Sequence, residues 1–130
     1  MTKRWLTLGA VVLAVATGAL SASAASATDP LTLDSGYVTD QADVLSPAEE
    51  EQVESRLQEL TDNSSADLFV VLVDDFTDPS DSVEWADQVA NDNRLGPDQY
   101  LLAIAVDGRS LYISADSSGP LSDGRIAAIE

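Results

Sequence analysis

Two runs of consecutive apolar residues stand out from the polar background of this chain, at residues 68–73 and 100–106. Neither run alternates with polar residues, which is the pattern of a strand buried on both faces. We therefore predict that both lie in the middle of a parallel sheet. The segment 109–115 alternates instead, and Asp107-Gly108 before it has the composition of a two-residue hairpin turn that needs positive φ. This segment is predicted to be an antiparallel strand nearer the sheet edge.

A helix is predicted over residues 47–60, after a short strand that begins near Tyr37. Its start is closely specified by Ser46 and Glu49, which fit a capping box with Pro47 between them. The apolar stripe of this helix consists of Val53, Leu57 and Leu60.

A second helix is predicted over residues 81–93, and a third begins at Ser122. The resulting order is β-α-β-α-β-β-α, which predicts an α/β fold with three layers and one antiparallel strand. We expect right-handed crossovers that place the helices on both faces of the sheet. The third helix is cut short at residue 130, so we expect a C-terminal portion of the domain to be missing.

The N-terminal 27 residues have the layout of a secretory signal peptide. Lys3 and Arg4 precede an apolar run from residue 6 to residue 20, and two small-residue cleavage sites follow. The alternative is a membrane anchor that is never cleaved. The sequence thus predicts an exported protein that is extracytoplasmic or faces the cell envelope. Its predicted divisions are a signal peptide at 1–27, a flexible leader at 28–36 and one domain at 37–130.

The chain is strongly acidic, with a formal net charge of −17 at pH 7. Loss of Lys3 and Arg4 with the signal peptide would lower the count of Lys and Arg from 6 to 4 and bring the net charge to −19. Such a chain is repelled by nucleic acid, which we exclude as a partner. The acidity is compatible with divalent cations or basic partners. The chain has no Cys, so no disulfide framework stabilises it.

The missing residue types exclude several kinds of catalysis. There is no His or Cys, and the only Lys is Lys3 in the signal segment. Ser-His-Asp, Cys-His and Ser-Lys mechanisms therefore have no candidate residues, and neither has a zinc site built from His or Cys. Carboxylates, hydroxyls, a few Arg residues and the backbone remain.

Carboxylates follow each of the predicted parallel strands. Because the carboxyl ends of parallel strands share one edge of a sheet, these side chains should lie along that edge, where ligands of α/β folds usually bind. Oxygen ligands without His or Cys suit Ca²⁺ or Mg²⁺. The alternative is that they serve only as helix caps and turn residues. The candidate metal ligands are Asp40, Asp43, Asp74, Asp75 and Asp107.

The stretch from Val38 to Ser46 resembles the opening motif of TPM domains, V-x-D-x-A-x-x-L-S, and the order of elements after it is similar as well. The resemblance runs from about Tyr37 to Glu130 and lacks the usual closing helices. It implies a Rossmann-like α/β/α sandwich outside the cytoplasm, often tethered by a later transmembrane helix. Some members of the family are described as acid phosphatases, some bind Ca²⁺ or Mg²⁺, and some act through protein partners.

Two segments depart from the family pattern. Many members carry D-N-G-V before the third strand, where this chain has Asp98-Gln99-Tyr100-Leu101, and the usual G-Y-G-L after the fourth strand is replaced by residues 115–119. Both departures weaken an inherited phosphatase activity. The prediction is therefore an interaction module with a protein partner and a divalent cation. The alternatives are a metal-dependent acid phosphatase acting on phosphomonoesters and a purely structural head domain of a membrane protein.

Overall fold

A computed structural model of the chain describes residues 27–121, and its centre is a four-stranded mixed sheet in the order β2-β3-β5-β6. The first three strands are parallel, and β6 runs antiparallel to β5. A second, two-stranded parallel sheet pairs β1 with β4. The strands are β1 (Ala27–Thr28), β2 (Val38–Asp40), β3 (Asp67–Val73), β4 (Asp75–Phe76), β5 (Gln99–Ala105) and β6 (Ser110–Ser114).

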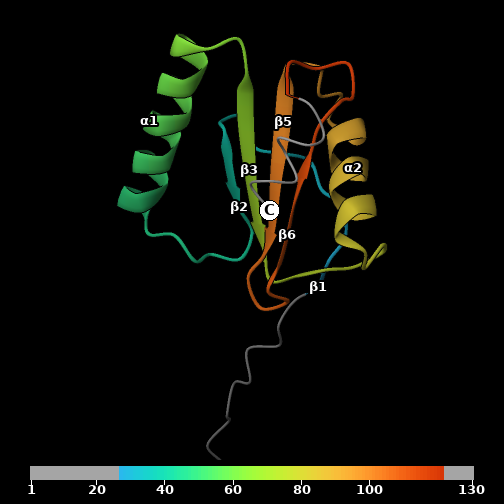
Figure 1. Cartoon of the computed structure of the whole chain (residues 1–130). Helices are drawn as coiled ribbons and strands as arrows, with labels where there is room; N and C mark the ends of the chain where they lie inside the picture. Colours follow the sequence, from blue (N-terminus) through green and yellow to red (C-terminus); the bar gives the residue numbers. More distant parts are fainter. Residues whose placement is uncertain (1–26, 122–130) are drawn as a thin grey trace, which may run out of the picture.

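Two helices cover opposite faces of the central sheet (Figure 1). The first, α1 (Pro47–Asn63), packs mainly against β2 and β3, and the second, α2 (Ser82–Asp92), packs against β5 and β6. The predicted three-layer α/β arrangement with one antiparallel hairpin strand is therefore confirmed. The predicted start of α1 is also confirmed, because Ser46 and Glu49 form the capping box.

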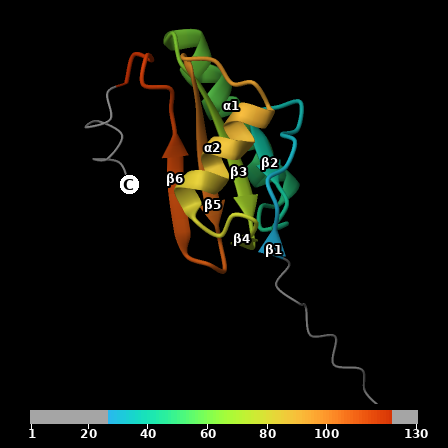
Figure 2. The ribbon, with the colours of Figure 1, turned by 90° about the vertical axis from the view of Figure 1, so that its right-hand side faces the viewer.

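The two crossover connections have opposite hands. The chain crosses the sheet in one direction, from β2 to β3 to β5, whereas α1 and α2 lie on different faces. In Figure 2, α2 lies in front of the sheet, β3 and β5 point downward, and β5 lies to the left of β3. That connection is right-handed, so the β2-α1-β3 connection is left-handed, and the prediction of right-handed crossovers is wrong there. Since β2 has only three residues, it carries little of the strand twist that normally sets the hand.

The larger hydrophobic core lies between α2 and the sheet. Trp85, Ala86 and Val89 of α2 are fully buried against alternate residues of β3 and β5. The other face is covered by α1, whose Leu57 packs with Val38, Val70 and Leu72. β3 has a hydrophobic core on each face, and Leu102 and Ile104 of β5 are partly buried against the α1-side cluster. The apolar runs therefore do not alternate, as the sequence predicted.

The hairpin between β5 and β6 differs from the predicted two-residue turn. Ala105 pairs with Ser110, so four residues separate the strands, and the residue with positive φ is Arg109, at 50°. Gly108 serves a different purpose, because a Cβ there would clash with the carboxylate of Asp75. The turn is thus shaped by its contact with Asp75 at the start of β4 as well as by its own sequence.

The segment 28–36 belongs to the folded unit, and the prediction of a flexible leader is wrong for it. The indole N–H of Trp85 donates to the carbonyl oxygen of Thr28 at 2.8 Å. Asn93 accepts the N–H of Leu33 and donates to the carbonyl oxygen of Leu31, both at 2.9 Å. Leu31 and Leu33 also pack against the core on the α2 side. Few apolar residues surround these two leucines in the sequence, and they pack against residues of α2 that are distant along the chain. The local pattern therefore did not predict their docking.

Two predictions concern residues that the structure does not describe. They are the signal peptide, apart from Ala27, and the helix that begins at Ser122. Within residues 27–121, no helix has the length and apolar character needed to span a bilayer.

Candidate functional site

The predicted acidic edge lies where the carboxyl ends of β2, β3 and β5 meet. Backbone bonds tie its loops together: Gln41 N–H donates to Leu72 O at 2.8 Å, and Asp107 N–H donates to Asp74 O at 2.9 Å. The five candidate ligands therefore follow strands that end at the same edge, as the topology predicted.

Contacts with the backbone account for several of these carboxylates. Asp40 Oδ2 accepts the N–H of Leu45 at 2.8 Å, which closes the loop before α1. Asp75 Oδ1 accepts the N–H of Phe76 at 2.9 Å. Asp43 is exposed and has a φ of 53°, a conformation that Asp adopts in turns. These roles correspond to the alternative of caps and turns.

Convergence of carboxylates is not seen at this edge. Among residues 27–121, no three His, Cys, Asp or Glu side chains form a group that could hold a metal ion. Asp40 Oδ1 is buried and has no hydrogen-bond partner within the same residues. The cation at Asp40, Asp43, Asp74, Asp75 and Asp107 stays a prediction.

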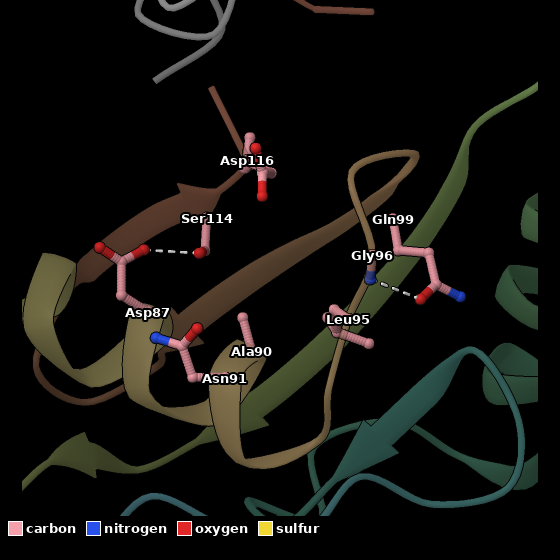
Figure 3. Close-up of a pocket in the computed structure, with 9 residues that line it drawn as sticks. Asp87, Ala90, Asn91, Leu95, Gly96, Gln99, Ser114 and Asp116 are labelled. Atoms are coloured by element: carbon pink, nitrogen blue, oxygen red, sulfur yellow. Dashed lines mark hydrogen bonds between the residues drawn. The ribbon is translucent and has the colours of Figure 1, made fainter. Parts of the chain in front are cut away.

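A polar hollow lies at the opposite edge of the sheet, between the C-terminal half of α2, the loop before β5 and the end of β6 (Figure 3). Its volume is about 210 Å³. Most of the side chains around it carry oxygen acceptors, and none of the described lining residues is Lys or Arg. The polar residues that line it are Asp87, Asn91, Gln99, Ser114 and Asp116.

One short hydrogen bond joins the two sides of this hollow. The hydroxyl of Ser114, at the end of β6, donates to Asp87 Oδ1 on α2 at 2.5 Å. Ser114 is buried and Asp87 is half-buried. This bond places one carboxylate at the wall of the hollow and fixes its orientation.

The second carboxylate of the hollow is held by a tight turn. Asp116 Oδ1 accepts the hydroxyl of Ser118 at 2.6 Å and its backbone N–H at 2.8 Å. These bonds, the hydroxyl first, lower the pKa of Asp116 below its ordinary value because they stabilise the ionised form. The hollow therefore has a charged rim at neutral pH.

The two segments that depart from the TPM pattern both border this hollow. Gln99, in the segment that replaces D-N-G-V, lines it and accepts the N–H of Gly96 at 2.9 Å. Ala115 and Asp116 stand at the start of the segment that replaces G-Y-G-L. A Cβ at Gly119 would clash with Pro97 O and lie 3.0 Å from the Tyr100 hydroxyl, so the second segment closely approaches the first. The rule that ligands bind at the carboxyl ends of parallel strands did not predict the hollow. The sequence signal that could have indicated it is that two segments depart from the family pattern in the same chain.

The fold and this hollow define a small α/β/α domain whose candidate site lies at the edge where β5 begins. Residues 38–130 match the model of the TPM domain family. The chain belongs to the TPM domain family.

Relatives were found in curated proteins and in solved structures. The chain is 33% identical over 120 residues to UPF0603 protein Rv2345 of Mycobacterium tuberculosis, and equally to UPF0603 protein MT2410 of another strain. Each match covers 92% of this chain but only 18% of the relative, so the chain spans less than a fifth of their length.

Two solution structures share the fold. One is the N-terminal domain of a protein from P. gingivalis, with a TM-score of 0.61, 24% identity, and coverage of 72% of this chain and 63% of that one. The other is the N-terminal domain of the cg2496 protein from Corynebacterium glutamicum, with a TM-score of 0.61, 20% identity, and coverage of 78% and 70%. At these identities the likeness concerns the fold alone.

Proposed function

We propose that this TPM domain is an extracytoplasmic interaction module that binds a basic group of a protein partner in the polar hollow. The observation that carries the proposal is the composition of the hollow. Asp87 and Asp116 stand at its wall and rim, and no described lining residue supplies a positive charge. A Lys or Arg side chain of a partner would supply the missing charge and the donors.

The charge of the whole chain supports a basic partner. With a net charge of −17, the protein attracts cationic surfaces over several ångströms and speeds their encounter. Within residues 27–121, Arg56 forms a salt bridge with Glu59 at the surface of α1, away from the hollow. Neither Asp87 nor Asp116 forms a salt bridge within these residues, so their charges stay available for a ligand.

A divalent cation is the second part of the proposal. Ca²⁺ or Mg²⁺ would find oxygen donors at either edge of the sheet, at the hollow or at the acidic edge that includes Asp40 and Asp107. A cation at the hollow would compete with a basic group, whereas one at the acidic edge would leave the hollow open. The two locations are therefore separable by experiment.

The test is an amide NMR titration of the full chain with three probes: Ca²⁺, Mg²⁺ and an acetylated Gly-Arg-Gly amide peptide. We expect the peptide to shift amides around Ser114 and Gln99, and Asp87→Asn with Asp116→Asn to abolish the shifts. Glu51→Gln on the exposed face of α1 removes one charge elsewhere and should leave them unchanged. Equal loss in the control would show non-specific charge attraction and contradict the proposal.

A metal-dependent acid phosphatase remains the alternative function. The observation that favours it is the Ser114 hydroxyl bonded to Asp87 at 2.5 Å, which offers a hydroxyl next to a carboxylate at the hollow. The assay is hydrolysis of p-nitrophenyl phosphate with and without Mg²⁺ across acidic pH. Activity that depends on Mg²⁺ and disappears in Asp87→Asn would favour the phosphatase over the interaction module. Activity that survives Asp74→Asn with Asp75→Asn would exclude the acidic edge as its site.

A further inference from the structure

A second hollow lies beside β2, the edge strand on the other side of the sheet from β6 (Figure 1). Its volume is about 340 Å³, and it opens between the middle of α1 and the start of β2. The two hollows share none of their described lining residues, so they can be tested separately. We call the second one the aromatic hollow, and its described lining residues are Ser35, Gly36, Tyr37, Glu54, Gln58 and Phe69.

Two aromatic rings form one wall of the aromatic hollow. The centroids of the Tyr37 and Phe69 rings lie 5.4 Å apart, and the ring planes are inclined by 36°. Both residues are half-buried, so part of each ring stays open to a ligand. The backbone of Tyr37 is held on both sides, because its N–H donates to Glu54 Oε2 at 3.0 Å and its carbonyl oxygen accepts the N–H of Val70 at 2.7 Å. This wall is therefore in place before a ligand arrives.

The α1 side of the aromatic hollow supplies hydrogen-bond acceptors. Each oxygen of the Glu54 carboxylate accepts one backbone N–H, and because a carboxylate oxygen has two lone pairs, each keeps a second acceptor position. Gln58 Nε2 donates to Asp62 Oδ1 at 3.1 Å, which leaves the amide oxygen of Gln58 as an acceptor. None of the described lining residues is Lys or Arg. A negative charge thus stands beside two aromatic rings with no cation among the described residues of the hollow.

Charge and ring chemistry together select a cation as the ligand. A cation over the face of an aromatic ring is attracted by the electrons of the ring, and a half-buried carboxylate attracts it further. Among side-chain cations, the guanidinium of Arg suits this hollow better than the ammonium of Lys. The guanidinium is flat and weakly hydrated, stacks on aromatic faces, and carries several N–H donors for the oxygens of Glu54 and Gln58. A neutral ligand such as a sugar would stack on the rings but would leave the charge of Glu54 unused.

We propose that the aromatic hollow binds an arginine side chain of a partner protein. The guanidinium lies against Tyr37 and Phe69, and its N–H groups donate toward Glu54 and Gln58. The site is separate from the polar hollow and does not depend on it. Together the two hollows favour a partner segment with two basic residues, because a second contact made by the same segment raises the overall affinity. The net charge of −17 favours the approach of such a segment.

The test is an NMR titration of the full chain that carries Asp87→Asn and Asp116→Asn, so that the polar hollow is disabled. The probe is the acetylated Gly-Arg-Gly amide peptide, and the signals followed are the amides of Gly36 and Phe69 and the δ-methylene protons of the peptide arginine. We expect both amides to shift and the methylene protons to move upfield in the ring currents. Tyr37→Leu should weaken binding roughly fivefold and abolish the upfield shift, whereas Tyr37→Phe keeps the ring and should preserve both.

A second pair of variants leaves the aromatic wall intact. Gln58→Lys places a positive charge at the aromatic hollow and should abolish binding, whereas Gln52→Lys makes the same change on α1 outside the hollow and should leave binding unchanged. Both glutamines are exposed, so neither change disturbs the core. Equal losses in the two variants, equal affinity for an acetylated Gly-Lys-Gly amide, or absence of shifts at the aromatic hollow would each overturn the proposal. In the unsubstituted chain, shifts at Ser114 and Gln99 report the polar hollow, so the failure of either site is recognised separately.

Discussion

The carboxylate of Glu54 accepts the backbone N–H of Val38 at 2.8 Å, which ties the middle of α1 to the start of β2. Its second oxygen accepts the N–H of Tyr37 at 3.0 Å. A Cβ at Gly36 would clash with this carboxylate, so glycine permits the close approach. Because β2 has only three residues, these two bonds give it a second attachment beside its pairing with β3.

Removal of that carboxylate should therefore destabilise the fold. Glu54→Ala leaves two backbone donors without their acceptor, and we expect a loss of about 1–3 kcal/mol in the free energy of unfolding. Glu54→Gln keeps one oxygen acceptor and should lose less. The measurement is urea unfolding followed by circular dichroism, with Glu51→Ala on the exposed face as the control. Equal losses for Glu54→Ala and Glu51→Ala would show that the bonds contribute nothing.

The attachment of the N-terminal segment rests on Asn93, which holds Leu31 and Leu33 through its amide. Asn93→Ala removes both bonds, so we expect the amide of Leu33 to exchange with solvent much faster while the amides of β3 keep their protection. Asn91→Ala, on the exposed side of the same helix, is the matched control. If the Leu33 amide exchanged at the same rate in both variants, the bonds to Asn93 would not be needed, and packing of Leu31 and Leu33 alone would hold the segment.

The core of the α2 side can be tested at Leu101, which is fully buried. Leu101→Ala leaves a cavity between α2 and the sheet, and the expected cost is about 2–5 kcal/mol. Val83→Ala, at a position 40% exposed, should change stability little. The readout is the midpoint of urea unfolding at constant m-value. A small loss at Leu101 would mean that the site collapses around the missing side chain.

The fold was largely predictable because its signals are local. The apolar runs at 68–73 and 100–106 and the capping box at Ser46 each depend on neighbouring residues, and each corresponds to an element of the structure. The hydrogen bonds from β2 to Glu54 and the docking of residues 28–36 join residues that are far apart in the sequence. A local pattern of apolar and polar residues therefore could not predict them. The left-handed β2-α1-β3 connection was not predicted for a similar reason. Its hand depends on the order of the strands in the sheet and on the face that α1 covers.

The candidate site was predicted less well. The rule that ligands bind at the carboxyl ends of parallel strands directed attention to Asp40, Asp74 and Asp107. The polar hollow lies at the other edge because β6 is antiparallel, so its last residue, Ser114, arrives where β5 begins. A rule for parallel strands does not account for a residue delivered by a hairpin.

The capping box gives a pH-dependent contribution to stability. The Ser46 hydroxyl and its backbone N–H lower the pKa of Glu49 from its ordinary value of 4.5. A folded pKa below the unfolded one stabilises the native state above the unfolded pKa, and this stabilisation is lost as the pH falls through the folded pKa. Ser46→Ala should lower the free energy of unfolding near neutral pH, and the loss should become progressively smaller on acidification. A cost independent of pH would contradict the involvement of Glu49.

The turn at Asp116 offers a direct measurement of how the rim of the hollow is charged. The hydroxyl and N–H of Ser118 lower the pKa of Asp116 from its ordinary value of 3.8, so Ser118→Ala, which removes the hydroxyl and keeps the N–H, should raise the pKa part of the way back. Because the folded pKa is the lower one, the turn is most stable above about pH 4 and loosens as the pH falls through the folded pKa. Carbonyl-detected NMR across acidic pH gives the pKa in each protein, and Ser117→Ala, one residue away and exposed, is the control.

If binding of the Gly-Arg-Gly peptide weakens over the same pH range in which Asp116 titrates, the carboxylate is part of the site. If binding persists below that range, Asp87 and the amides of the hollow hold the ligand without it.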